Sequence, residues 1–473
     1  MNASLSAATT PDPYSWQFVD AVKQWVDEHF ESIVEELAEL VTYKSLAFEG
    51  YDRGALEASA HRVAELFSDV GFDEIHHLTE TDDGQTSGPA IIGRKHAAGN
   101  KSTVLLYAHH DVQPVGDLHA WTTDPWVATE RNGRLYGRGT ADDKAGIIVH
   151  RTAIRALNQL FGEQHGLGLT VFIEGEEEIG SPFFAQFLQN HRQLLSADTI
   201  VVADTANWGV GVPALTTSLR GLLDGIIEVT VADHPVHSGL FGGPMLDAIT
   251  ILARIIAELH TPDGDVAVND LDQSRWTDAV YDESDYRSQS GTVEGLHLAG
   301  TGSLADRLWN KAALNIIGID ATPISEASNS IVHTARAKFS MRLGPGMEPA
   351  QVMQSVTDYV KSLNAHGARV EVYPGEQGKP FIVESDAETI ELMKTSLSDA
   401  WGSEAIETGL GGSIPFVADL VEAFPDANIL LTGIEDPDTK AHSPNESLDL
   451  SVLRHAIEAQ VLLLARMAHD PVE

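Results

Sequence analysis

Five short segments of the chain each contain a side chain that can bind a metal ion. The segments read YAHHDVQP (107–114), GRGTADDK (137–144), EGEEEIGS (174–181), VVADTANW (201–208) and AHSPNE (441–446). The candidate ligands in them are His109, Asp142, Glu178, Asp204 and His442. All five offer nitrogen or oxygen donors, and the chain has no cysteine. Such a donor set suits Zn²⁺ or Mn²⁺.

The charges of these ligands favour a centre for two divalent ions. Asp142, Glu178 and Asp204 each bring one negative charge, while two neutral imidazoles bring none. Two divalent ions and one bound hydroxide would therefore neutralise the set. Each ion would keep an open coordination position, which is typical of catalytic rather than structural metal sites.

Short apolar runs stand directly before three of these ligands. The runs are 104–107, 169–173 and 199–203, and they are typical of buried strands. In an open parallel sheet, sites form outside the carboxyl ends of the strands. We therefore expect strand ends to bring His109, Glu178 and Asp204 into one crevice. A fourth run, 428–432, precedes the loop that carries His442.

Taken singly, some of these residues have simpler interpretations. His110 is the nearest alternative to His109, but the HxD spacing favours His109 because it leaves Asp111 free to orient the ring. Asp142 or Asp143 could cap the helix that comes next, since Asp is a favoured N-cap residue. Capping would explain only one of these two acids and none of the other segments.

Two other kinds of enzyme chemistry are not favoured. No GxSxG elbow follows a predicted strand, which argues against a serine hydrolase. No phosphate-binding glycine loop stands between a strand and a helix, which argues against nucleotide chemistry. The acids at 176–178 could form a solvated turn, but three acids directly after a buried strand would repel one another without a cation.

Length and charge set the broad class of protein. A chain of 473 residues is long enough for two or three domains. The formal net charge of −40 argues against nucleic acid or an anionic membrane as a partner. The first residues lack a basic, apolar leader, and no stretch approaches the roughly 20 apolar residues of a membrane span. We therefore expect a cytoplasmic protein.

The order of predicted elements indicates one domain inserted into another. Strands and helices alternate over 1–216, which predicts an α/β domain. The pattern changes at 217–381, where two strand–helix–strand units predict a compact α+β domain with a long loop at 261–306. Strand and helix patterns of the first kind return over 382–473.

The ordered motifs HxD, GRGxxDxK, EGxEExGS, a strand-end Asp and AHSxNE resemble the di-zinc metallopeptidases of the aminoacylase, carboxypeptidase G and carnosinase family. The resemblance runs from about residue 30 to the end of the chain. SLRG, HSGLFGG and GGSIP bring the sequence nearest to the carnosinase-like dipeptidases. The resemblance implies a mostly parallel-sheet di-metal catalytic domain, with the inserted α+β domain acting as a lid and dimerisation domain.

The resemblance also implies how the metal ligands divide. His109 and Asp204 would hold one ion, Glu178 and His442 the other, and Asp142 would bridge the two. The sequence departs from the common pattern at Ala108, where glycine is common, and at Asp143, where asparagine is common. A third acid, Glu176, leaves the register of the acidic run open, although Gly180–Ser181 supports Glu178 as the ligand. None of these departures removes a ligand.

Further roles are implied by the same resemblance. Asp111 would orient His109, and Glu177 would be the general base. His237, from the inserted domain, would reach the reacting carbonyl, often in the neighbouring subunit of a homodimer. Arg342 and the turn Gly411–Gly412–Ser413 would hold the carboxylate of the substrate.

The implied enzyme is a metal-dependent dipeptidase or short-peptide exopeptidase that cleaves near a free C-terminal carboxylate. Two divalent ions would serve it, with Zn²⁺ favoured and Mn²⁺ or Co²⁺ as alternatives. An N-acyl amino acid deacylase, such as a desuccinylase or deacetylase, would use the same residues. A catalytically silent metal-binding protein is a third interpretation, against which the intact base Glu177 argues.

Overall fold

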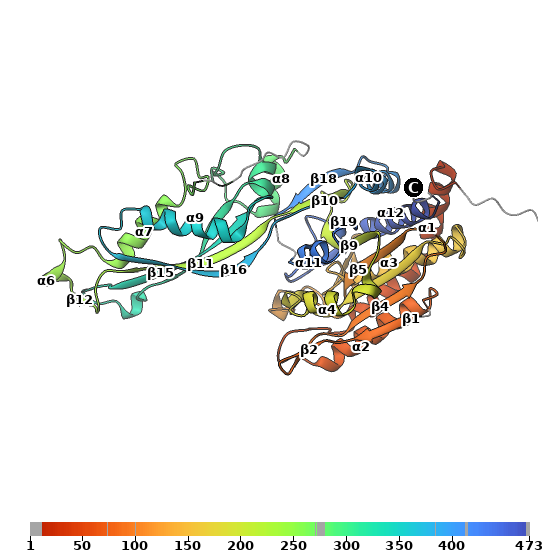
Figure 1. Cartoon of the computed structure of the whole chain (residues 1–473), viewed down its shortest axis with the longest axis horizontal. Helices are drawn as coiled ribbons and strands as arrows, with labels where there is room; N and C mark the ends of the chain where they lie inside the picture. Colours follow the sequence, from red (N-terminus) through yellow and green to blue (C-terminus); the bar gives the residue numbers. More distant parts are fainter. Residues whose placement is uncertain are drawn as a thin grey trace, which may run out of the picture. The chain divides into compact units, whose positions relative to one another are not determined.

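The chain forms two compact units in the computed structural model (Figure 1). Unit 1 comprises Met1–Thr217, Val383–Thr408 and Asp419–Glu473, and unit 2 comprises Ser218–Ile382 and Gly409–Ala418. The structure describes residues 12–72, 74–99, 101–269, 271, 280–383, 385–411 and 415–469. Each unit has a hydrophobic core of its own.

The core of unit 1 is built on a nine-stranded sheet. Its order is β1 (Glu74–Leu78), β4 (Ala90–Lys95), β8 (Gly168–Glu174), β5 (Thr103–His109), β9 (Thr199–Ala206), β19 (Asn428–Glu435), β10 (Ala214–Leu219) and β17 (Phe381–Ile382), with β18 (Ile406–Leu410) paired to β10. Of this sheet, β17 and the last residues of β10 and β18 belong to unit 2. The central strands β8, β5, β9 and β19 are parallel, and the strands outside them pair antiparallel. The predicted mostly parallel α/β fold is therefore confirmed.

The central strands are buried on both faces, which explains their nearly continuous apolar sequences. Every residue of β8 is buried, and only the first residue of β5 is not. The helices α1 (Trp16–Val41), α3 (Lys144–Leu160), α10 (Ala387–Trp401) and α12 (Leu450–His469) pack against one another, while α2 (Arg53–Ser68) packs on β1 and β4. Figure 1 shows these helices beside the orange and yellow strands of the sheet.

The remaining elements of unit 1 are short. They are β2 (Thr81–Asp82), β3 (Gln85–Thr86), β6 (Thr129–Arg131), β7 (Arg134–Tyr136), α4 (Phe184–Asn190), α5 (Arg192–Leu195) and β20 (Ser447–Asp449), with α11 (Pro415–Ala423) crossing the boundary between the units. Strand β20 pairs with β7, so that Ser447 lies opposite Tyr136. This pairing joins the segment after His442 to the segment before Asp142, although the two are far apart in sequence.

Unit 2 is built on a four-stranded antiparallel sheet. Its order is β13 (Ala313–Asp320), β15 (Thr334–Leu343), β11 (Gly221–Thr230) and β16 (Arg369–Gly378). Helices α7 (Ala248–Glu258) and α9 (Pro349–Ser362) pack on this sheet. Buried residues alternate with more exposed ones along β15, because helices cover only one face of the sheet.

Short elements complete unit 2. They are β12 (Val236–His237), β14 (Ser330–Ile331), α6 (Ser238–Phe241) and α8 (Glu283–Ser290). Helix α8 lies inside the stretch 261–306 that was predicted to be a long loop. No helix among the described residues is both long enough and apolar enough to cross a membrane.

Candidate metal centre

Three parallel strands carry predicted ligands to one end of the sheet in unit 1. His109 is the last residue of β5 and pairs in register with Glu174, the last residue of β8. The chain then turns, and Glu178 lies in a short 3₁₀ helix, Glu177–Ile179. Asp204 lies near the end of β9, on the other side of β5. The strand ends therefore meet as the sequence predicts.

The structure gathers all five predicted ligands into two adjacent clusters. His442 Nε2 lies 2.9 Å from Asp142 Oδ2 and 3.2 Å from Glu178 Oε2. His109 Nε2 lies 3.1 Å from Asp142 Oδ1 and 3.9 Å from Asp204 Oδ1. Asp142 therefore faces each imidazole with a different oxygen. A carboxylate placed in this way can contribute one oxygen to each of two ions.

Asp143 lies in the same cluster as His109 and Asp204, which the sequence patterns did not predict. Ligand atoms of His109, Asp143 and Asp204 all lie within 4.8 Å of one another. Asp143 Oδ2 accepts a hydrogen bond from the backbone N–H of His109 at 3.2 Å. Although Asp143 is the N-cap residue of α3, its side chain makes no capping hydrogen bond. Helix capping therefore does not explain the side chain of Asp143. In the sequence, the only sign of its position was that a second acid follows Asp142 directly.

Asp111 holds the turn that carries Glu177 and Glu178. Its two carboxylate oxygens accept the backbone N–H groups of Glu177 at 3.1 Å and Glu178 at 3.0 Å. The same carboxylate lies 3.4 Å from His109 Nδ1, as its predicted orienting role requires. His110 points elsewhere, with Nε2 2.8 Å from the carbonyl of Pro89, and burial lowers its pKa to about 4.

The three consecutive acids have different surroundings. Glu176 is buried and accepts the backbone N–H groups of Gly88 at 2.7 Å and Phe183 at 3.2 Å, which is a structural role. Glu178 belongs to the cluster that also contains Asp142 and His442. Glu177 Oε2 lies 3.9 Å from His109 Nε2, and its side chain is 19 % exposed. Glu177 therefore lies beside the candidate ligands and is only partly exposed.

Glu446 fixes the backbone around Asp142. It is fully buried, and Arg138 Nη1 donates to its Oε2 at 2.6 Å. It also accepts the backbone N–H groups of Gly139, Ala141 and Asp142 at 3.0, 3.1 and 3.3 Å. Glu446 ends the AHSPNE segment, and Arg138 lies in GRGTADDK. Both residues therefore stood in recognised motifs, but the sequence did not indicate that they pair with each other. The pair ties the two segments together.

Burial and crowding change the pKa values of these groups. Burial raises the pKa of Asp204 well above its ordinary value, and Glu177 adds to the rise against the opposing effect of His109. Burial raises the pKa of Glu177 to about 8. Burial also raises the pKa of Glu178, as does the charge of Asp142. Hydrogen bonds to Asp142 and Glu178 raise the pKa of His442 to about 10.

The charge and crowding of this arrangement suit a bound cation. Four carboxylates and two imidazoles stand close together in a largely buried place. Among the described residues, Glu178 Oε1 is buried without a hydrogen-bond partner. Uncompensated buried charges are costly, whereas coordination to divalent ions would satisfy these oxygens. The donor set and its surroundings therefore fit metal ions.

The residues predicted to bind substrate belong to unit 2. His237 is exposed, and its Nδ1 accepts the backbone N–H of Gly239 at 3.0 Å. Arg342 is half-buried in β15, between Leu222 of β11 and Ala313 of β13. Gly411 comes directly after β18, while Gly412 and Ser413 lie outside the described residues. How these residues meet the metal ligands of unit 1 stays a prediction.

Metal binding at this centre should release protons near pH 7. The pKa values of Glu177 and His442, about 8 and 10, lie above 7, so both groups hold a proton at neutral pH when no metal is bound. Because ligands must lose their protons to bind, affinity should fall as the pH falls. Titration calorimetry in buffers with different ionisation enthalpies should show release of at least one proton per chain. Heats that do not depend on the buffer would contradict this expectation, and His442→Ala should release fewer protons.

Comparison with known proteins agrees with this centre. The model of peptidase family M20/M25/M40 matches residues 105–466. The chain is 34% identical over 440 residues to the cysteinylglycine-S-conjugate dipeptidase of Corynebacterium striatum, covering 92% of this chain and 95% of that protein. It is 26% identical over 481 residues to human beta-Ala-His dipeptidase, covering 95% and 92%.

Solved structures have the same fold. Human carnosine dipeptidase 1 superposes with a TM-score of 0.77 at 25% identity, covering 96% of this chain and 99% of that one. The dipeptidase Dug1p of Saccharomyces cerevisiae gives a TM-score of 0.77 at 22% identity, covering 97% and 100%. The resemblance seen in the sequence motifs is therefore confirmed. The chain belongs to peptidase family M20/M25/M40 and is a metallopeptidase.

Proposed function

We propose that this enzyme is a dipeptidase that uses two divalent ions to cleave short peptides next to a free C-terminal carboxylate. The observation that carries the proposal is Asp142, whose two oxygens face His109 and His442 at 3.1 and 2.9 Å. Two relatives are themselves named dipeptidases, one for cysteinylglycine S-conjugates and one for beta-Ala-His. Their names support the class of reaction, and the physiological peptide of this chain is a separate question.

The ligand set divides around Asp142. In the proposal, His109 and Asp204 hold one ion, Glu178 and His442 hold the other, and Asp142 contributes to both. Zn²⁺ suits these nitrogen and oxygen donors, with Mn²⁺ and Co²⁺ as alternatives. Bound ions of this kind polarise a carbonyl and lower the pKa of water.

Glu177 is the proposed general base. Its carboxylate lies beside His109 and keeps access to solvent. In this position it can take a proton from the attacking water and pass the proton to the leaving amine. Its pKa of about 8 reflects burial and the neighbouring acids Glu178 and Asp111. Cations bound at the centre would lower that pKa and leave Glu177 ready to accept a proton at neutral pH.

Replacing Glu177 with Gln should separate catalysis from metal binding. Gln keeps the shape of the side chain but cannot accept the proton, so turnover should fall by about 10²–10⁴-fold. Elemental analysis should still find two ions per chain in Glu177→Gln. Glu178→Gln is the matched comparison and should lose metal as well as activity. If Glu177→Gln sheds an ion and Glu178→Gln does not, the two roles are reversed.

Arg342 is the proposed anchor for the carboxylate of the peptide. Its planar guanidinium can donate two parallel hydrogen bonds to a carboxylate. The turn that begins at Gly411 would add backbone N–H groups near the start of α11, where helix geometry favours anions. This anchor distinguishes an exopeptidase from an enzyme that cuts within longer chains.

A dipeptide amide should be cleaved far more slowly than the free dipeptide, because it lacks the charge that Arg342 binds. Arg342→Lys should lower kcat/KM about tenfold or more on the free dipeptide, since a lysine cannot reproduce the two-pronged contact. Arg336→Lys is a matched control on the same strand, where the arginine is half-exposed and pairs with Glu228. Equal kcat/KM for free dipeptide and amide would contradict the anchor.

A deacylase would share the whole metal centre, so the centre does not separate the two activities. The dipeptidase names of the relatives favour peptide hydrolysis. Values of kcat/KM measured on mixed dipeptides and on N-acetyl and N-succinyl amino acids, with Zn²⁺ or Mn²⁺ added, would show which of the two activities is greater. A cytoplasmic location accords with the proposal and stays a prediction.

A homodimer through unit 2 completes the proposal. Among the described strands, β13 has a neighbour only on one side, namely β15. Ile317 and Ile319 of β13 are 57% and 60% exposed, and Ile324 after it is 96% exposed. An edge strand with exposed apolar side chains is suited to pairing with a second copy. The exposed His237 could then serve the centre of the partner subunit.

Mixing two inactive variants tests this arrangement. His237→Ala lacks the reaching imidazole, and Glu177→Gln lacks the base. If His237 acts across the dimer, a mixed dimer holds one intact site and should recover up to about half of the wild-type activity per dimer, while each variant alone stays inactive. Native mass spectrometry would verify the mixed dimers. Verified mixed dimers without recovered activity would rule out action across the interface.

A further inference from the structure

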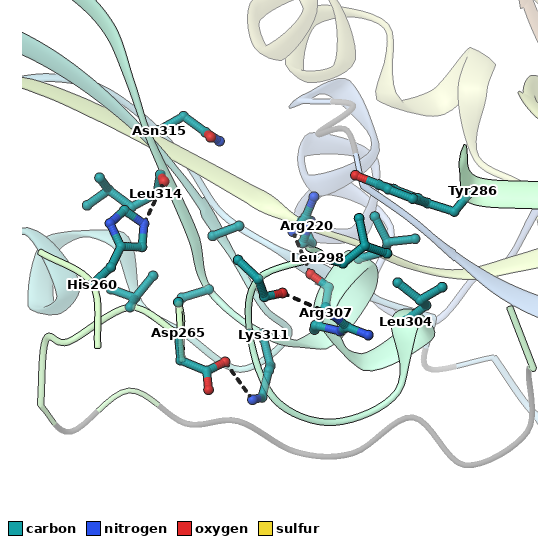
Figure 2. Close-up of a pocket in the computed structure, with 17 residues that line it drawn as sticks. Arg220, His260, Asp265, Tyr286, Leu298, Leu304, Arg307, Lys311, Leu314 and Asn315 are labelled. Carbon is teal, nitrogen blue, oxygen red and sulfur yellow. Dashed lines mark hydrogen bonds and ion pairs between the residues drawn. The ribbon is translucent and has the colours of Figure 1, made fainter. Parts of the chain in front are cut away.

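Unit 2 contains a cavity to which the function proposed above assigns no role. Its volume is about 450 Å³. The walls come from α8, the first residues of β13 and the segments 264–266 and 298–308, with Arg220 at one side (Figure 2). Arg220 belongs to the SLRG motif, and neither the metal centre nor the proposed carboxylate anchor uses it.

Arg220 is a buried charge without an acidic partner in the part of the chain that the structure describes. Its residue is 8% exposed. Nε donates to the carbonyl of Gly411 at 3.3 Å, and Nη1 donates to the carbonyl of Arg307 at 3.4 Å. No carboxylate of the described residues lies within ion-pair distance of it. Burial, together with the charge of Arg342, lowers the pKa of Arg220 to about 10, so the group is still charged at neutral pH.

The other charges around the cavity leave an excess of positive charge. Lys311 pairs with Asp265 at 2.9 Å, and Asp265 also accepts hydrogen bonds from Thr301. Arg307 donates to the backbone carbonyls of Ala299 and Ser303 at 3.0 and 3.3 Å. The one acid of the lining is thus engaged, while two guanidinium groups have only neutral acceptors. In a chain of net charge −40, such a place is suited to an anion.

The rest of the lining is apolar. Leu298, Leu304 and Leu314 line the same cavity, and Figure 2 shows Leu298 next to Arg220 and Leu314 next to His260. A phosphate would leave these leucines without an apolar contact. A carboxylate on a short hydrocarbon chain would contact the leucines and could accept two hydrogen bonds from one guanidinium.

We propose that this cavity binds a carboxylate that carries a short apolar group, with Arg220 as the anchoring guanidinium. The carboxylate comes either from the C-terminal residue of the peptide substrate, which Arg220 would then bind together with the neighbouring charge of Arg342, or from a free small carboxylic acid. The first source rests on the proposed dipeptidase function, whereas the second does not. Both use the same contact with Arg220.

Binding of isovalerate to the metal-loaded enzyme tests the contact. Isovalerate has the carboxylate and the branched apolar group, and isovaleramide is its neutral counterpart. Titration calorimetry should show binding of isovalerate and at least tenfold weaker binding of isovaleramide. Arg220→Met should weaken isovalerate binding by about 10- to 100-fold, as the loss of a charged hydrogen bond does. Arg336→Met, which removes an arginine of unit 2 outside the cavity, should bind isovalerate like the wild type.

Two further variants cover the case in which Arg220→Met does not fold. Arg220→Lys keeps the charge and should weaken binding by about tenfold because the fork is lost. Leu298→Asp leaves Arg220 in place and puts a competing carboxylate on the cavity wall, so it should abolish isovalerate binding. Circular dichroism would verify folding of each variant. Unchanged isovalerate affinity in the folded Arg220 variants, as coordination to the metal centre alone would give, overturns the proposal.

Kinetics of the same proteins identify the source of the carboxylate. If the peptide's C-terminus occupies the cavity, isovalerate competes with the dipeptide, and Arg220→Met reduces the preference for free dipeptide over its amide. If a free acid occupies it, inhibition or activation is not competitive and that preference is unchanged. Both results support the carboxylate site. Failure of the wild type to cleave any dipeptide would refute the proposed function and leave the isovalerate measurement valid.

Discussion

The repulsion between buried carboxylates is the interaction on which the rest of unit 1 depends. Asp142, Asp143, Glu178 and Asp204 stand within a few ångströms of two imidazoles, and burial raises the pKa of three of the four. Asp142 is the exception: although burial raises its pKa, hydrogen bonds with His109 and His442 lower it overall. Like charges assemble in this way only when the surrounding structure holds them there and a cation compensates them.

The structure holds these groups with rigid strands and with other acids. Strands β5, β8 and β9 fix His109 and Asp204, while Asp111 and Glu446 hold the turns between them through backbone N–H groups. Because the carboxylates of Asp111 and Glu446 are held by backbone N–H groups, they fix the loops without being free to move themselves. The acidic residues of the motifs therefore divide into those that face the metals and those that position the backbone.

Local sequence patterns predicted the parts of the site that lie on regular elements. A buried strand followed at once by His or an acid indicated His109, Glu178 and Asp204, because strand direction fixes where the next side chain lies. One of the two strand–helix–strand units predicted within 217–381 corresponds to β15, α9 and β16. Asp143 and Glu446 could not be assigned in this way, since their roles depend on contacts between distant segments. Helix α8 was not predicted within the stretch 261–306 because it lacks an apolar face. His237 and Arg342 belong to unit 2, and their predicted roles rest on the family resemblance because no local pattern assigns them to the centre.

The contacts of Glu446 have a consequence for how the protein is made. Glu446 and His442 are synthesised after unit 2, yet they complete a site whose other ligands lie before residue 205. Strand β19 must also enter the sheet next to β9 before the segment that carries them is in place. A chain made only as far as residue 441 therefore has His109 and Asp204 but lacks His442, which faces Asp142 and Glu178. The backbone around Asp142, whose N–H Glu446 accepts, is accordingly fixed only after residue 446 has been made.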